Sequence, residues 1–141
     1  MSNTRFAVAV HVLSVLRLSD GQTVPSSLLA SSVGTNPVVI RKLLVVLAQA
    51  GLIVVERGNS GGARLARAAD DVNLADVLDA VTGVGDMVKI HGEANPACPV
   101  GRNIGHVLDL ILNDGFDAFR SILAKHTIED LVQSIRARDA G

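Results

Sequence analysis

The chain has 141 residues, of which 48% are hydrophobic and 2% aromatic, with one cysteine and a formal net charge of −1. One cysteine excludes an intrachain disulfide, and the longest apolar run (43–55) contains Gln49 and follows Arg41 and Lys42, so it does not read as a membrane span. With no signal-peptide pattern at its start, we expect a cytoplasmic protein. The composition favours a core of Leu, Val, Ile and Ala, and therefore one mainly helical domain with or without an oligomerising appendage.

The small net charge hides a division between the two halves of the chain. Residues 1–68 carry seven basic and two acidic side chains, a net charge of +5, whereas residues 69–141 carry six basic and twelve acidic side chains, a net charge of −6. Charge can divide unevenly by chance in a small protein. The positions of the basic residues nevertheless favour a first half that faces a polyanion such as DNA.

Three helices are predicted in the first third of the chain. Apolar residues at helical spacing indicate the first helix over 4–18, and Pro25 opens a short second helix that ends near Gly34. Asn36 and Pro37 begin the third, because Asn caps free N–H groups and Pro is tolerated in the first turn. The tight linker between the second and third helices predicts a helix-turn-helix.

The third helix is predicted to run to Ala50 and to have two different faces. Its buried stripe is predicted to contain Ile40, Leu43, Leu44 and Leu47, which recur at helical spacing. Its outward positions are predicted to be Asn36, Val38, Arg41, Lys42 and Gln49.

A β-hairpin, the wing, is predicted directly after this helix. Gly51 ends the helix as a left-handed cap, and the β-branched residues 53–55 predict a strand. The glycine-rich segment 58–62 predicts a turn before a return strand over 63–66. One Arg flanks each side of that turn, so the sequence predicts a DNA-reading helix followed by a basic wing.

The second half of the chain is predicted to hold three further helices. Asn73 caps the first of them, which stops at Gly83, and residues 84–99 form a loop that is a candidate sensor segment. Residues 100–125 predict one helix longer than a small domain needs, with Gly115 as a place where it would kink or end. A partner helix would cover its apolar stripe, so we expect a homodimer. The predicted interface residues are Ile104, Leu108, Ile111, Leu112, Phe119 and Ile122.

The chain is predicted to end in a short helix. Thr127 and Asp130 resemble a capping box that starts this helix, which would run to about Arg136 before a frayed terminus. The predicted fold class is therefore mainly α with a small β-hairpin. The predicted domains are a winged helix-turn-helix domain over 1–83, a sensor-type loop over 84–99, and a dimerisation helix with a C-terminal helix over 100–141.

Five short motifs together resemble the Rrf-two family of winged helix-turn-helix transcription regulators, which includes IscR, NsrR and CymR. The motifs are Val24-Pro25, Gly51-Leu52-Ile53, Arg57-Gly58 with Gly61-Gly62, Leu74-Ala75-Asp76-Val77 before Ala80-Val81, and the segment 95–101, which is similar to the YwnA-like branch. The resemblance spans almost the whole chain.

The resemblance implies a set of DNA contacts, which are Asn36, Val38, Arg41, Lys42, Arg57, Ser60 and Arg64. The first turn of the third helix would enter the major groove, where Arg can bind guanine, Asn adenine and Val a thymine methyl. Arg57 in the wing would reach a narrow minor groove, and the other basic residues would hold phosphates. The alternative for each residue is an ordinary solvated side chain.

The loop departs from the cluster-binding members of the family. Those members carry three cysteines spaced by six, whereas here Asp86 and Gly92 stand at the first two positions and only Cys98 matches. Thiolates hold iron-sulfur clusters, so we predict no cluster and no other metal. An unusual site shared across the dimer, with Cys98 joined by a histidine or carboxylate, is an alternative. Without such a site, two interpretations of Cys98 remain. It is either a redox thiol, activated at the N-terminus of the long helix, or a small buried hydrophobe.

The leading hypothesis is a homodimeric DNA-binding repressor whose two recognition helices lie in successive major grooves of a pseudo-palindromic operator, with redox response through Cys98. The alternative is a winged-helix module that binds protein and not DNA, although the basic wing argues against it. An enzyme is not expected, because the sequence shows no catalytic triad, phosphate-binding loop or zinc spacing. The sequence leaves the effector open.

Overall fold

The computed structural model describes residues 4–58, 61–82, 88, 90–92 and 94–141. The first half contains α1 (Arg5–Leu18), α2 (Ser26–Val33), α3 (Pro37–Gln49), β1 (Ile53–Glu56) and β2 (Gly62–Leu65). The second half contains the 3-10 helix η1 (Ala69–Asp71), then α4 (Leu74–Val81), α5 (Pro99–Leu123) and α6 (Ile128–Ala140). The predicted fold class, mainly α with a small hairpin, is confirmed.

Helices α2 and α3 form the predicted helix-turn-helix. The chain turns by 109° between them, which is within the range of about 90–120° that defines this motif. Asn36 caps α3, because its side chain accepts a hydrogen bond from the N–H of Val39 at 3.1 Å. The predicted buried stripe is confirmed, since each of its four residues is at most 5% exposed.

Strands β1 and β2 form the predicted antiparallel hairpin, with Ile53 opposite Leu65. Gly51 precedes the hairpin with the left-handed backbone expected of it, at a φ of 78°. The hairpin is tied to the helix-turn-helix by Ala63, whose N–H and carbonyl pair with the backbone of Val24 at 2.9 and 2.8 Å. A Cβ on Gly62 would lie 2.3 Å from the carbonyl oxygen of Val24, so only glycine allows this close approach.

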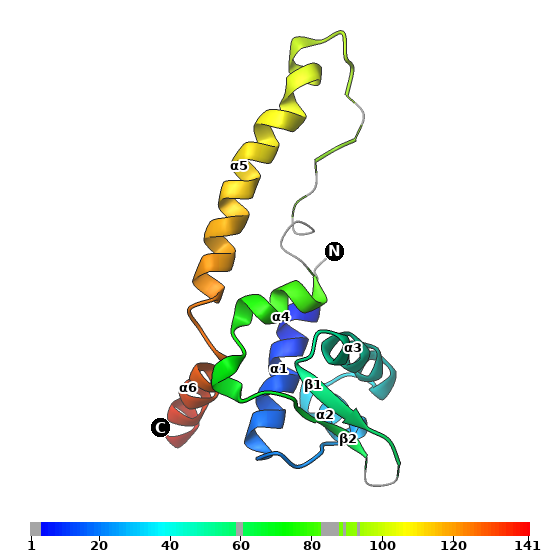
Figure 1. Cartoon of the computed structure of the whole chain (residues 1–141), viewed down its shortest axis with the longest axis vertical. Helices are drawn as coiled ribbons and strands as arrows, with labels where there is room; N and C mark the ends of the chain where they lie inside the picture. Colours follow the sequence, from blue (N-terminus) through cyan, green and yellow to red (C-terminus); the bar gives the residue numbers. More distant parts are fainter. Residues whose placement is uncertain (1–3, 59–60, 83–87, 89, 93) are drawn as a thin grey trace.

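The helices and strands other than α5 pack together and are called the body. Helix α1 lies at the centre of the body, with α3, α4 and α6 around it (Figure 1). The core is aliphatic, as the composition predicts. Its largest fully buried side chains are Leu13, Leu16, Leu29, Ile40, Leu47, Leu52, Ile128, Val12, Val72, Val77 and Val132.

Helix α6 packs into this core. Ile128 and Val132 are both fully buried, and the predicted capping box at Thr127 is confirmed. Arg17 of α1 donates to the carboxylate of Glu129 at 2.5 and 3.2 Å, and this contact, with a hydrogen bond from Gln133, holds the pKa of that carboxyl below its ordinary value. The predicted end at Arg136 is wrong, because the helix continues to residue 140. The predicted domain division, which groups α6 with the long helix, stays a prediction.

Residues 72–74 and 126–128 lie side by side. Asn73 and Thr127 form an isolated antiparallel bridge. The N–H of Leu74 donates to the carbonyl of His126, and the N–H of Ile128 donates to the carbonyl of Val72, each at 2.9 Å. The backbone that precedes α4 is therefore hydrogen-bonded to the backbone that precedes α6, although the long helix lies between them in the sequence.

Helix α5 projects from the body as one helix of 25 residues (Figure 1). It continues through Gly115, so the prediction that this glycine ends a segment is wrong. Near its C-terminal end, Arg120 forms a bidentate ion pair with Asp79 of α4. No residue of α5 is buried, and Val100, Val107, Ile111 and Ile122 are between 48% and 65% exposed. Its apolar stripe is thus only partly covered by the described part of its own chain.

Among the described residues, no single helix combines the length and the apolar composition of a membrane span. Helices α2 and α3 reach those values only when they are counted together, across the bend between them.

Candidate nucleic-acid interface

The outer face of α3 is open to solvent and carries most of the predicted contacts. Val38 is 52% exposed, and Arg41 and Lys42 beside it are also exposed. Val39 and Val45, at 45% and 56%, share this solvent exposure although they are absent from the predicted set. Val45 lies two helical turns after Val38, and that spacing would have identified it as a neighbour on the same face.

Asn36 stands at the start of this face, but its side chain is already engaged. The cap directs Oδ1 toward the helix backbone at Val39, whereas bidentate binding of adenine needs Oδ1 and Nδ2 to face the base together. Giving up such a cap typically costs about 0.5–2 kcal/mol. In the capped conformation Nδ2 is the group that Asn36 can direct at DNA, as a hydrogen-bond donor.

The two arginines of the wing differ in their surroundings. Arg64 on β2 donates to the carboxylate of Glu56 on β1 at 3.1 Å. Arg57, one residue past β1, is exposed, and within the described residues it makes no ion pair. Ser60 lies outside the described residues. Of these two arginines, only Arg64 is therefore paired with a carboxylate among the described residues.

Cys98 is the N-cap residue of α5, and Pro99 is the first residue of the helix. The predicted position at the N-terminus of the long helix is therefore confirmed. The thiol is exposed, so the alternative in which Cys98 packs as a small buried hydrophobe is wrong for this chain. Arg102, in the first turn, donates to the carbonyls of Pro96 and Ala97 at 3.3 Å and fixes the turn that precedes the thiol.

A helix-turn-helix with an exposed basic third helix and a basic hairpin beside it defines the class of winged helix-turn-helix regulators. The chain belongs to the Rrf2 family, which is the Rrf-two family that the sequence motifs indicated. The family model, described as an iron-dependent transcriptional regulator, matches residues 2–134. The chain is accordingly a transcriptional regulator and not an enzyme.

Individual relatives agree with this membership. The chain is 33% identical over 135 residues to YwnA of Bacillus subtilis (strain 168), classed with the HTH-type transcriptional regulators, and the match covers 96% of this chain and 99% of YwnA. A crystal structure from Lactobacillus plantarum, assigned to the transcriptional regulators, superposes with a TM-score of 0.75 at 27% identity, over 98% and 99% of the two chains. The structure of CymR, the global cysteine regulator of B. subtilis, has a TM-score of 0.68 at 20% identity, over 95% and 97%, and shows the shared fold.

The donor atoms of this chain do not fit the iron-sulfur cluster that the family's iron-dependent members imply. Such clusters are held by several thiolates, and the whole sequence contains one cysteine. Among the described residues, no three His, Cys, Asp or Glu side chains are grouped to hold a metal ion. Gly92, one of the two positions where a cluster ligand would stand, has no side chain to offer, and Asp86, the other, lies outside the described residues.

Proposed function

We propose that this regulator binds a pseudo-palindromic operator as a homodimer and represses transcription. The observation that carries the proposal is the open outer face of α3, with Val38, Arg41 and Lys42 exposed beside the wing. Arg can bind guanine in the major groove, Val can contact a thymine methyl, and Lys can hold a phosphate. Such binding represses transcription where the operator overlaps the DNA that the transcription machinery needs, because a bound dimer excludes other proteins from that DNA.

The proposed dimer forms through α5. Of the predicted interface residues, Ile111 and Ile122 are 61% and 58% exposed, and the other four are half-buried. A helix that leaves a long apolar stripe in water is stabilised when a second copy covers it. Two-fold symmetry would then place two α3 helices in major grooves about 34–36 Å apart, one turn of DNA.

Fluorescence anisotropy of labelled DNA from upstream of the protein's own gene tests DNA binding. We expect binding that discriminates against unrelated DNA and weakens steeply with salt, with a log-log slope of about −0.9 for each phosphate contact. Absence of binding by reduced, oxidised and metal-supplied protein would instead favour a winged-helix module that binds protein.

The wing offers a matched pair of substitutions. Replacing Arg57 with Ala is expected to weaken operator binding by about fivefold to tenfold and to make the salt slope about one unit shallower, because a minor-groove cation is lost. Replacing Arg64 with Ala should have a smaller effect, because Arg64 is held by Glu56. Anisotropy titrations of both variants measure the difference, and equal affinities for Arg57→Ala and the unaltered protein would contradict the role of the wing.

We also propose that oxidation of Cys98 alters DNA binding. The thiol is exposed at the start of α5, the helix proposed to join the two protomers, so a sulfenic acid or mixed disulfide there would change the dimer contact. Treatment with peroxide is expected to change operator affinity by about fivefold or more. The Cys98→Ser variant contains no thiol and should not respond; an unchanged peroxide response in this variant would remove Cys98 as the sensor.

A further inference from the structure

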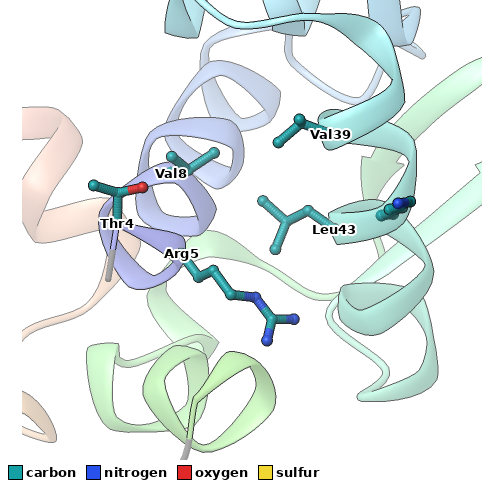
Figure 2. Close-up of a pocket in the computed structure, with 6 residues that line it drawn as sticks. Thr4, Arg5, Val8, Val39 and Leu43 are labelled. Carbon is teal, nitrogen blue, oxygen red and sulfur yellow. The ribbon is translucent and has the colours of Figure 1, made fainter. Parts of the chain in front are cut away.

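A hollow of about 280 Å³ lies between α1 and α3, directly beside the proposed recognition surface. Its lining residues are Thr4, Arg5, Val8, Val39, Lys42 and Leu43. Figure 2 shows Val8 of α1 facing Val39 and Leu43 of α3 across the space, with the side chain of Arg5 extending along one edge. The hollow thus has apolar walls from both helices and lies between the recognition helix α3 and α1.

The charges of the lining select the kind of molecule that fits. Lys42 adds a positive charge to apolar walls, and no acidic side chain is among the described residues that line the space. A molecule of liquid water occupies about 30 Å³, so the volume of the hollow equals that of roughly nine to ten water molecules. It therefore suits a ligand with about that many non-hydrogen atoms. We propose that this hollow is an effector site for a small amphipathic anion, a carboxylate joined to a short apolar body.

The proposal rests on the proposed function, because the site shares residues with the DNA-binding surface. Lys42 is a proposed phosphate contact, and a bound carboxylate would neutralise it and add negative charge close to the DNA backbone. Val39 lies in the first turn of α3, where its N–H bonds the capping side chain of Asn36. The anion is therefore expected to weaken operator binding, and DNA to weaken anion binding by the same factor.

Octanoate is the probe of choice, since its apolar chain and single carboxylate match the hollow in size and charge, and 1-octanol is its neutral counterpart. In the full-length protein with labelled Val and Leu methyl groups, we expect octanoate to cause saturable NMR shifts at Val8, Val39 and Leu43. Saturating octanoate should lower operator affinity by about fivefold or more in the anisotropy assay. The same concentration of 1-octanol should bind more weakly and leave operator affinity unchanged.

A charge substitution separates site binding from general hydrophobic association. Lys42→Gln should weaken octanoate binding by about two- to fivefold, whereas Lys125→Gln, at an exposed position after α5, should leave it unchanged. Absence of shifts at the three methyl-bearing residues, or equal affinities for octanoate and 1-octanol, would overturn the site even if DNA binds. Octanoate binding without loss of operator affinity would overturn the effector role. Shifts at these residues in a protein that binds no DNA would support the site and refute the operator-binding function.

Discussion

Replacing Ile111 with Glu is expected to convert the proposed homodimer into monomers and to weaken operator binding by about a hundredfold or more. Ile111 is 61% exposed at the middle of the α5 stripe, and covering such a side chain contributes about 1.5–3 kcal/mol. Because a two-fold interface contains the residue twice, one substitution removes two contacts and adds two carboxylates to an apolar surface. Sedimentation velocity measures the loss of the dimer, and anisotropy the loss of affinity.

Leu110 supplies the control for this substitution. It is 58% exposed on the same helix, but consecutive residues of a helix point in different directions, and Leu110 is outside the predicted interface set. Leu110→Glu should therefore leave the dimer intact. A dimeric Ile111→Glu variant with unaltered operator affinity would show that protomers meet through another surface.

Replacing Ile128 with Ala is expected to lower the free energy of unfolding by about 2–5 kcal/mol, because the side chain is fully buried where α6 meets α1. Ile135→Ala on the same helix is the matched control, since Ile135 is 43% exposed and should cost much less. Urea denaturation followed by circular dichroism measures both, at one protein concentration because the proposed dimerisation would add to the apparent stability. Equal, small losses for the two variants would mean that α6 does not belong to the core.

Local signals in the sequence were sufficient for most of the secondary structure. The caps at Asn36, Asn73 and Thr127 depend on hydrogen bonds to a backbone three residues away, so they can be recognised from neighbouring residue types. The outward face of α3 follows from helical periodicity alone. The end of α6 was missed because no glycine or proline lies between Arg136 and Ala140, and alanine and arginine continue a helix readily.

Contacts between distant segments could not be predicted in this way. Arg17 and Glu129 are 112 residues apart in the chain, and nothing near either residue indicates the other. The pairing of Arg64 with Glu56 depends on the register of the hairpin, which a glycine-rich turn leaves open. Val8 and Leu43 line one hollow although they belong to different helices, and the residue spacing within either helix does not indicate that they face each other.

The backbone bridge between Asn73 and Thr127 closes the segment 74–126, which contains α4 and α5, into a loop whose two ends are hydrogen-bonded to each other. The entropy of closing such a loop depends weakly on its length, about 0.6 kcal/mol for each doubling. Turns added to or removed from α5 would therefore change the stability of the body little. They would change the distance between the two DNA-binding bodies of a dimer. The same DNA-binding body could then be adapted to operators of different half-site spacing by altering the length of α5 alone.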